Sequence, residues 1–496
     1  MQLAPVLMVQ GTASSAGKST LTTGLCRLFA RRGVRVAPFK AQNMSNNAAV
    51  CADGGEIGRA QFAQAMAAGV VASVDMNPIL LKPQAETAQV VIRGRVAGAE
   101  TAAAYWQASR HEQLWPVVVD ALERLRRDYE LVIAEGAGSP AEINLRERDV
   151  VNMRVARHAQ ADVVLVADID RGGAFASLLG TWEWLNADER RLVRGFVLNK
   201  FRGDASLLAP APRLLEERTG VHVLGVVPYV HDLGLPDEDG ASLEERPRPR
   251  ACVEIAIVHL PHLANFDEFG ALLEEACISV RYVSDPLELR APDLVILPGT
   301  KATIPDLVWL KERGLGARIQ WLAEHGIPVL GVCGGYQMLG TLVTDPMRIE
   351  SEVARANGLG LLPVETEVTS DKRLANVRGS VLPHGTGVWR RLTGAAVDGY
   401  EMHMGRTRSV AEHAAWLSVD DQPEGSASAE LPVVGTQVHG VLRSNAARGA
   451  LIQGLCEARG FGYASSQTLE KDPFDGLADV LEASLELDAL SAAARL

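Results

Sequence analysis

A glycine-rich segment near the start of the sequence has the residues needed to bind the phosphates of a nucleotide. Gly11 and Gly17 enclose a loop that follows an apolar, strand-like run and precedes a helical pattern. Glycines let such a loop curl, so that its N–H groups and the helix N-terminus face phosphate oxygens. The Lys18 ammonium would reach the β- and γ-phosphates, and the Ser19 hydroxyl would bind Mg²⁺. The predicted ATP-binding residues of this segment are Gly11, Thr12, Gly17, Lys18, Ser19 and Thr20.

The spacing of this loop departs from the commonest phosphate-binding pattern. Five residues separate Gly11 from Gly17, whereas a strict Walker A loop has four. The longer loop resembles the dethiobiotin synthetase branch of P-loop proteins, whose members phosphorylate a carboxylate. The alternative is a glycine-rich turn with a chance lysine, which the strand–loop–helix context disfavours.

A magnesium–nucleotide site also needs carboxylates at neighbouring strand ends. Glu135 ends the apolar run 131–135, and the carboxyl ends of parallel strands meet at the edge where the loop would lie. Asp53 is a weaker second candidate and could equally be a turn residue. Asn199 ends another strand-like run, where nucleotide-binding relatives read the base, or it is an ordinary strand-end cap. The predicted Mg²⁺ ligands are therefore Ser19, Glu135 and Asp53, and Asn199 joins the ATP-binding set.

The second half of the chain contains residues suited to nucleophilic catalysis. Cys333 follows the apolar run 328–332 and precedes two glycines and a helical pattern. This is the pattern of a nucleophile elbow, in which the helix N-terminus favours the thiolate and the Gly334 amide can stabilise an oxyanion. His439 follows another strand-like run and could act as the base. Either residue alone is usually structural, but the elbow favours a catalytic pair.

These residues resemble those of the class I glutamine amidotransferases. The resemblance implies that Leu297–Thr300 supplies the second oxyanion amide from around Gly299 and Thr300, and that Gln337 helps to hold glutamine. Most members have a glutamate two positions after the histidine, but this chain has Val441 there. The cobyric and cobyrinic branch lacks this glutamate. What orients the His439 ring is therefore left open by the sequence.

The two predicted centres complement each other chemically. Ammonia does not attack a carboxylate readily, whereas an acyl phosphate has a good leaving group. Free ammonia is mostly protonated at neutral pH, so releasing it from glutamine beside the activated acid keeps it nucleophilic. One chain with both centres is expected to be an ATP-dependent, glutamine-hydrolysing carbon–nitrogen ligase.

The elements that must position these residues alternate between strands and helices. Runs that are apolar throughout and separated by amphipathic segments predict an α/β fold, with a mostly parallel sheet in each of two domains. The expected strands of the first half are 6–10, 34–39, 131–135, 163–168, 195–199 and 223–227, and those of the second half are 253–259, 293–297 and 329–332. The expected helices include 19–32 and 266–276.

The polar, then Pro/Arg-rich stretch 231–250 is typical of a linker between domains. We expect a P-loop NTPase-like synthetase domain, which binds ATP and corrinoid, at 1–232 and a linker at 233–250. A class I glutamine amidotransferase domain, flavodoxin-like, would follow at 251–450, with a C-terminal helical extension at 451–496.

The composition excludes several functional classes. The chain has 496 residues and a net charge of −12, which disfavours nucleic acid or an anionic membrane as partner. We see no signal-peptide pattern and no run of about 18 consecutive apolar residues in it, so we expect a cytoplasmic protein. The six cysteines are scattered without a C-x-x-C pair, which fits a reducing compartment and predicts no zinc site.

Several longer stretches resemble the cobyric acid synthase family. They are 37–46, 53–61, 76–83, 135–144, 168–173 and 399–406, and with the loop and the elbow they span nearly the whole chain. The resemblance implies amidation of the b, d, e and g carboxylates of adenosylcobyrinic acid a,c-diamide in cobalamin biosynthesis. ATP and Mg²⁺ would serve as co-substrate and metal, glutamine and a corrinoid as substrates, with no tightly bound organic cofactor. The oligomeric state is left open.

The corrinoid side of the site must accept several similar carboxylates and carboxamides. The candidates carry amide, cationic or carboxylate groups, and for each a surface role is about equally plausible: Lys40, Gln42, Asn43, Asn46, Arg59 and Asp149. His403 could join the catalytic pair or serve packing. Two other functions remain alternatives: cobyrinic acid a,c-diamide synthase, and a MinD-like ATPase switch with a degenerate second domain.

Overall fold

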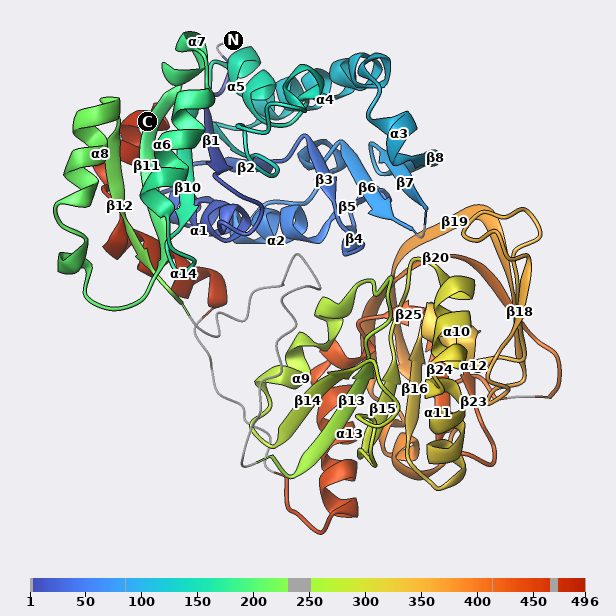
Figure 1. Cartoon of the computed structure of the whole chain (residues 1–496). Helices are drawn as coiled ribbons and strands as arrows, with labels where there is room; N and C mark the ends of the chain where they lie inside the picture. The colour runs from blue at the N-terminus through green and yellow to red at the C-terminus, as the bar shows by residue number, and fades with distance from the viewer. Residues whose placement is uncertain (1–2, 85, 231–250, 413, 464–471, 496) are drawn as a thin grey trace.

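The computed structural model describes residues 3–84, 86–230, 251–412, 414–463 and 472–495. It shows two α/β domains, one above the other in Figure 1, formed by residues 3–230 (the N-terminal domain) and 251–463 (the C-terminal domain). The stretch 233–250, predicted as a linker, lies outside the described residues. The predicted α/β fold class, with a parallel sheet in each domain, is confirmed.

The N-terminal domain is built on a six-stranded parallel sheet with strand order β12-β11-β10-β1-β9-β2. Its strands are rich in β-branched residues and are buried on both faces, as expected when helices cover both sides. The strands are β1 (Val6–Gly11), β2 (Val36–Phe39), β9 (Leu131–Glu135), β10 (Asp162–Asp168), β11 (Val193–Phe201) and β12 (His222–Pro228).

Helices from separate parts of the chain cover the two faces of this sheet. One face packs against α4 (Ala108–Asp128), α5 (Met153–Ala159) and α6 (Ala174–Trp184). The other packs against α1 (Lys18–Arg31) and the end of α2 (Arg59–Ala67). Shorter helices are α3 (Ala102–Tyr105), α7 (Ala187–Arg190) and α8 (Ala211–Thr219).

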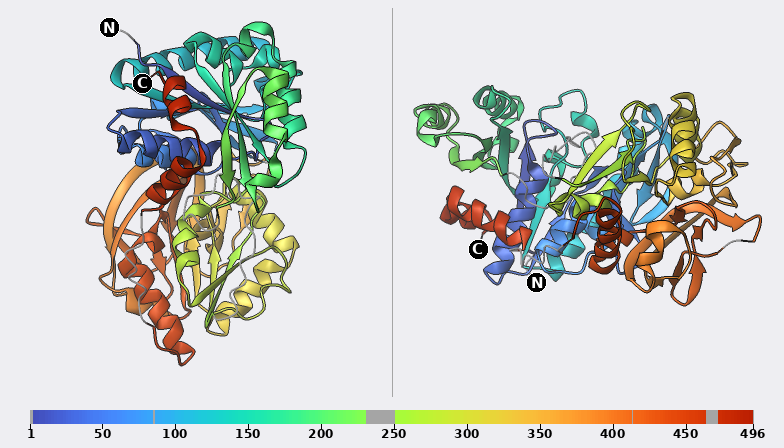
Figure 2. Two further views of the ribbon diagram at one scale, coloured as in Figure 1. Left: turned by 90° about the vertical axis from the view of Figure 1, so that its left-hand side faces the viewer. Right: turned by 90° about the horizontal axis from the view of Figure 1, so that it is seen from below.

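The last two helices of the chain return to the N-terminal domain. α14 (Pro473–Ser484) lies beside α1, as the left view of Figure 2 shows, and α15 (Leu487–Ala493) follows it and joins the same apolar cluster. The contact with α1 is so close that a Cβ atom on Gly24 would lie 2.4 Å from the side chain of Leu481. Arg27 of α1 also pairs with Asp475 at 2.8 Å. The C-terminal segment therefore belongs to the core of the first domain.

Between β2 and α3 the chain forms smaller sheets that reach toward the C-terminal domain. A four-stranded sheet has the order β3-β6-β7-β8, and a two-stranded hairpin pairs β4 with β5. These strands are β3 (Gln42–Met44), β4 (Ala48–Val50), β5 (Glu56–Gly58), β6 (Ile79–Pro83), β7 (Thr87–Ile92) and β8 (Arg95–Thr101).

The C-terminal domain has a six-stranded sheet with order β14-β13-β15-β16-β24-β23, parallel except for β23. Its strands are β13 (Val253–Val258), β14 (Ile278–Val283), β15 (Leu294–Leu297), β16 (Val329–Val332), β23 (Ser426–Ala427) and β24 (Val433–Thr436). One face packs against α10 (Thr303–Glu312), α11 (Leu315–Glu324) and α12 (Gly334–Leu339), and the other against α13 (Asn445–Ala458) and α9 (Gly270–Glu274).

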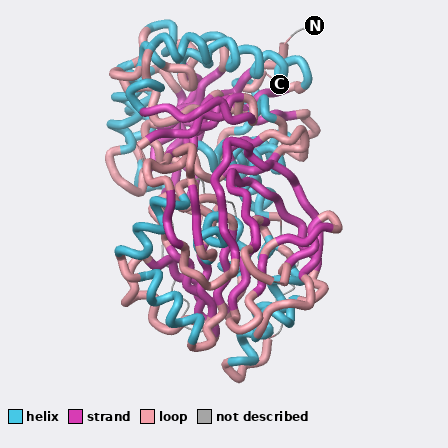
Figure 3. The backbone as a smooth tube through the Cα atoms, turned by 90° about the vertical axis from the view of Figure 1, so that its right-hand side faces the viewer, coloured by secondary structure: helices cyan, strands magenta, loops and turns pink. Residues whose placement is uncertain are grey.

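A second sheet of this domain carries two long antiparallel strands to the domain interface. β19 (Val364–Val381) and β20 (Ala396–Ser409) extend toward the N-terminal domain in Figures 1 and 3. Tyr400 and Met402 of β20 share a buried apolar cluster with Val50 of β4 and Leu80 of β6. The remaining strands are β17 (Leu342–Thr344), β18 (Arg355–Asn357), β21 (Leu417–Val419), β22 (Gln422–Glu424) and β25 (Val438–His439).

Across the described ranges, no helix combines the length and the apolar character needed to cross a bilayer.

Candidate active site

The glycine-rich loop of the N-terminal domain curls around the amine of Lys18. The Lys18 Nζ donates hydrogen bonds to the carbonyls of Ala13, at 2.9 Å, and Ser14, at 3.2 Å. Gly17 has a φ of 91°, and a Cβ atom there would lie 2.1 Å from Asn199 Nδ2. Glycine is therefore required where the loop turns into α1. The structure places Lys18, Ser19 and Thr20 in the first turn of α1, where unpaired N–H groups favour phosphate.

Glu135 lies beside this loop because β9 pairs with β1 in parallel. The Ser19 hydroxyl donates to Glu135 Oε1 at 2.7 Å, and the Lys40 amine lies 2.8 Å from the same oxygen. Gln64 donates to the other carboxylate oxygen at 2.7 Å. The structure thus brings together Ser19 and Glu135, two oxygen donors of the kind that Mg²⁺ binds, next to the phosphate loop.

The other residues predicted for this half have more varied positions. Asn199 donates from Nδ2 to the Ala16 carbonyl at 2.9 Å, so it supports the loop directly. Asp53 is exposed in the β4–β5 turn, where its carboxylate accepts hydrogen bonds from the amides of Gly55 and Val74. These contacts give Asp53 the role of a turn residue, and the structure does not bring it to Glu135.

Most of the candidates for corrinoid contact are held by other residues. Lys40 pairs with Glu135, and Gln42 accepts a hydrogen bond from Tyr105. Asn43 donates to Gln61 at 3.0 Å. The remaining partnered candidates are Arg59, which forms an ion pair with Asp267, and Asp149, which accepts hydrogen bonds from the amides of Val151, Asn152 and Arg154 around the start of α5.

Asn46 differs from these candidates. Its Oδ1 is buried and, within the described part of the chain, has no hydrogen-bond partner. His403, which could join the catalytic pair, donates from Nδ1 to the Gly405 carbonyl at 2.9 Å and lines the pocket described below.

The second centre lies at the carboxyl edge of the main sheet of the C-terminal domain. Cys333 stands between β16 and α12 with φ 51° and ψ −111°, the strained turn of a nucleophile elbow. A Cβ atom on Gly335 would lie 2.0 Å from the Leu297 carbonyl, and one on Gly334 would lie 3.1 Å from the Thr300 amide nitrogen. The elbow therefore packs directly against the loop 297–300, which brings Gly299 and Thr300 beside Cys333.

His439 completes a triad with a carboxylate from a third segment. The His439 ring contacts the Cys333 thiol, and its Nδ1 lies 2.7 Å from Glu268 Oε1. The Gly440 amide donates to Glu268 Oε2 at 2.8 Å, which fixes the carboxylate. Glu268 lies in the short helix η5 (Phe266–Phe269) that follows β13. Glu268 therefore orients the His439 ring. The sequence had left this role unassigned, because Val441 stands two positions after the histidine.

The triad is almost completely removed from water, which determines the charge state of the histidine. Burial by itself lowers the pKa of His439, but the Glu268 carboxylate and the Cys333 sulfur outweigh it and raise the pKa to about 10. The ring is therefore an imidazolium at neutral pH, the form that pairs with a thiolate. The arrangement suits nucleophilic attack by sulfur followed by proton donation from the ring.

The pocket in front of Cys333 has walls from both domains. Gln337 points its Oε1 to the Thr303 hydroxyl at 3.0 Å, and Lys301 pairs with Glu350 at 3.4 Å. Lys82 comes from β6 of the N-terminal domain, and the lining also includes Asn265, Gly299, Thr300, Lys372, His403 and His439.

Fully buried Glu56 holds the two interface lysines of this wall together. It pairs with Lys82 at 3.1 Å and also with Lys372. The two lysines hold the pKa of Glu56 below its usual value, despite the burial that would raise it. Burial lowers the pKa of Lys372 to about 7, although the Glu56 carboxylate opposes this, so the Lys372 amine is only partly charged at neutral pH.

Two domain families match the chain in this order. The CobQ/CobB/MinD/ParA nucleotide binding domain matches residues 7–243, and the CobB/CobQ-like glutamine amidotransferase domain matches residues 254–447.

Curated relatives extend over nearly the whole chain. The cobyric acid synthase of Dehalococcoides mccartyi strain CBDB1 is 44% identical over 99% of this chain and 99% of its own length. That of Chloroflexus aurantiacus is 47% identical over 97% of both chains. Among solved structures, PurLQS from Thermotoga maritima is 18% identical, with a TM-score of 0.32, and covers 40% of this chain and 97% of its own.

We expect the change Glu268→Gln to impair glutamine hydrolysis without unfolding the site, because the amide keeps the shape and can still accept from Gly440. Loss of the carboxylate lowers the pKa of His439, so the imidazolium is lost at lower pH. Steady-state glutamate release should fall in kcat by about 10²- to 10⁴-fold, and the alkaline limb of its pH profile should move to lower pH. Glu274→Gln, at an exposed residue of the next helix, is the matched control. An unchanged kcat and pH profile in Glu268→Gln would contradict the triad.

Proposed function

The chain belongs to the cobyric acid synthase family, and we propose that it converts adenosylcobyrinic acid a,c-diamide to adenosylcobyric acid. It is an ATP-dependent amide ligase that takes its nitrogen from glutamine. The finer proposal is that it amidates the b, d, e and g carboxylates through acyl phosphates. The observation that carries the proposal is that a phosphate loop and a Cys333–His439–Glu268 triad lie in domains that share one buried interface.

The N-terminal domain would activate the carboxylate. Backbone amides at the start of α1 and the Lys18 amine bind the triphosphate. Lys18 also stays bound to the γ-phosphate while it is transferred. Ser19 and Glu135 would hold Mg²⁺, which supplies neutralisation of phosphate charge when bound. Lys40 keeps Glu135 oriented, because its amine lies 2.8 Å from the carboxylate. The product of this half is an acyl phosphate, which is open to attack by ammonia.

The C-terminal domain would supply that ammonia. The Cys333 sulfur attacks the side-chain amide carbon of glutamine, and the resulting oxyanion faces the amides of Gly334 and of the Gly299–Thr300 loop. His439 donates its proton to the leaving nitrogen, while Glu268 stabilises the imidazolium before the transfer. Water then attacks the thioester, and His439 accepts its proton. Glutamate leaves, and the thiolate–imidazolium pair is restored.

The charged residues that line the pocket suit the α-carboxylate and α-ammonium groups of glutamine. An amino acid carries one carboxylate and one ammonium group, and the wall offers lysines and a carboxylate. Lys82 and Lys372 would bind the α-carboxylate, because both amines line the pocket and an incoming carboxylate would favour the charged form of Lys372. Glu350, at 3.4 Å from Lys301, would accept the α-ammonium. Since Lys82 belongs to the N-terminal domain, glutamine would be bound by both domains.

A mass measurement tests the substrate and the division of labour together. With adenosylcobyrinic acid a,c-diamide, ATP and glutamine, we expect product mass to show four added amides, with one glutamate released per amide. Cys333→Ala should abolish synthesis from glutamine but retain it with a high concentration of ammonium, because activation of the carboxylate is intact. Lys18→Ala should abolish synthesis from either nitrogen source.

Two results would contradict the proposal. Action on unamidated cobyrinic acid alone would assign the chain to the a,c-diamide synthase reaction instead. Absence of glutamate release, together with no effect of Cys333→Ala, would favour a nucleotide-dependent switch with an inactive second domain.

A further inference from the structure

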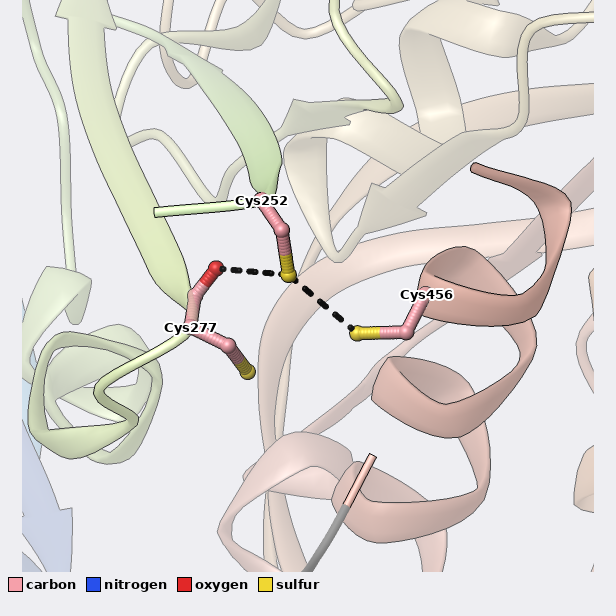
Figure 4. A group of neighbouring side chains, drawn as sticks. All are labelled: Cys252, Cys277 and Cys456. Atoms are coloured by element: carbon pink, nitrogen blue, oxygen red, sulfur yellow. Dashed lines mark hydrogen bonds between the residues drawn. The ribbon is translucent and has the colours of Figure 1, made fainter. Parts of the chain in front are cut away.

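Three cysteines that are far apart in the sequence meet at one end of the C-terminal domain. Cys252 precedes β13, Cys277 precedes β14, and Cys456 lies near the end of α13 (Figure 4). Their sulfur atoms all lie within 4.8 Å of one another, and those of Cys252 and Cys456 are 3.7 Å apart. Because β13 and β14 run parallel to β16, whose carboxyl end carries Cys333, this cluster lies at the opposite edge of the sheet. It therefore takes no part in glutamine hydrolysis.

The spacing of the sulfurs suits a single metal ion. Zinc–sulfur bonds are about 2.3 Å long, so two sulfurs on a tetrahedral zinc ion are about 3.8 Å apart. The distance between the sulfurs of Cys252 and Cys456 already has this value within about 0.1 Å. Figure 4 shows the three side chains converging from two neighbouring strands and one helix. Small side-chain rotations would bring all three sulfurs to bonding distance of one ion.

The surroundings allow an ion to enter and to be held. Cys456 is buried, whereas Cys252 and Cys277 are half-buried, so one side of the cluster is open to solvent. Two arginines of this part of the domain are already engaged, because Arg448 pairs with Glu275 at 3.0 Å and Arg459 pairs with Asp293. An ion would displace the three thiol protons to solvent as the thiolates bind it.

We propose that Cys252, Cys277 and Cys456 bind one thiophilic divalent metal ion, with zinc the expected one and water as its fourth ligand. Such an ion would fasten α13 to the first two strands of the C-terminal domain. The absence of a C-x-x-C pair made the sequence predict no zinc site, because the three ligands come together only in the folded sheet.

Metal stoichiometry of the full chain tests this site. Purified protein, equilibrated with Zn²⁺ and then freed of unbound ion, should retain about one zinc per chain by elemental mass spectrometry. Cys252→Ser and Cys277→Ser should each lose it, and Co²⁺ should give thiolate-to-cobalt charge-transfer absorption only in chains that keep all three cysteines of the cluster. Cys333→Ser and Cys51→Ser are matched controls that should keep the ion. Retention of less than a tenth of an equivalent by the unsubstituted chain, or equal zinc in the cluster variants, would overturn the site.

A second inference concerns how the N-terminal domain influences the triad, and it rests on the proposed function. Helix η5 carries Glu268, and its neighbour Asp267 lies 2.8 Å from Arg59 Nε of α2. Arg59 Nε has no hydrogen-bond partner among the described residues, so this contact is an ion pair, between side chains that are 9% and 1% exposed. The residue before η5, Asn265, accepts from the Ala48 amide at 3.0 Å and lies 3.5 Å from His439 Nε2.

These contacts connect the first domain to both sides of the catalytic ring. Arg59 fixes the segment from which Glu268 reaches Nδ1, and Ala48 fixes the amide that faces Nε2. A buried charge that loses its partner is strongly destabilised, so Asp267 favours the docked arrangement. Arg443 also pairs with Asp267, so the carboxylate keeps one partner when Arg59 is replaced.

We infer that Arg59 is a positioning residue for glutamine hydrolysis. The N-terminal domain, when docked, aligns Glu268 and His439 with Cys333. This assignment differs from a contact between Arg59 and the corrinoid, because the guanidinium is engaged with Asp267 and stacks near Phe62.

Kinetics of Arg59 variants separate these two roles. For Arg59→Met we expect kcat for glutamine hydrolysis to fall by about 10- to 100-fold, with KM for glutamine within about twofold and ammonia-driven synthesis unchanged. Arg59→Lys, which keeps the charge, should recover part of the loss. Arg27→Met, which removes an ion pair within the first domain, is the matched control.

Two outcomes would overturn the positioning role. One is an equal fall in the rate of synthesis with glutamine and with ammonia, which would place Arg59 at the corrinoid. The other is an unchanged kcat for glutamine. A failure of the unsubstituted chain to hydrolyse glutamine is distinguishable from both, since it would contradict the proposed function itself.

Discussion

Buried carboxylates that find their cationic partners on the opposite domain hold the two halves of this molecule together. Glu56 of the first domain pairs with Lys372 of the second, and Asp267 of the second pairs with Arg59 of the first. Removing one partner of a buried ion pair costs about 3–5 kcal/mol, because the other charge is left without compensation. On separation each carboxylate would lose one of its two cationic partners, because Glu56 would keep Lys82 and Asp267 would keep Arg443. The cost is therefore smaller than for a complete loss of pairing, but it still favours the docked arrangement.

This docked arrangement places the chemistry of each domain where the other can use it. The same β5 and β6 segments that supply Glu56 and Lys82 lie in the N-terminal domain with the phosphate loop, and Lys82 lines the pocket of Cys333. Helix η5 carries the triad carboxylate beside the residue that pairs with Arg59. Helix η5 therefore contributes both to the ion pair at the domain interface, through Asp267, and to the alignment of the triad, through Glu268.

The sequence was informative where local backbone chemistry determines structure. The strand ends at Glu135 and Cys333, and the glycines around Lys18, follow from apolar runs and glycine spacing, and the structure has them within a residue or two. Glu268 was missed because it comes from a segment 171 positions before His439, although two acidic residues after β13 were a usable signal. Lys40 and Arg59 were predicted for substrate, but burial and pairing across the fold give them other partners. The contacts of α14 with α1, and the cysteine cluster, likewise depend on tertiary packing alone.

The central proposal is that the docked domains act as one enzyme, so that nitrogen released at Cys333 is used by the carboxylate that the N-terminal domain activates. The direct test is synthesis from glutamine labelled with ¹⁵N in its side-chain amide, in a medium with excess unlabelled ammonium, followed by mass analysis of the corrinoid product. Our account predicts that the new amides carry ¹⁵N almost entirely. A product whose isotope content matches that of the medium would contradict it.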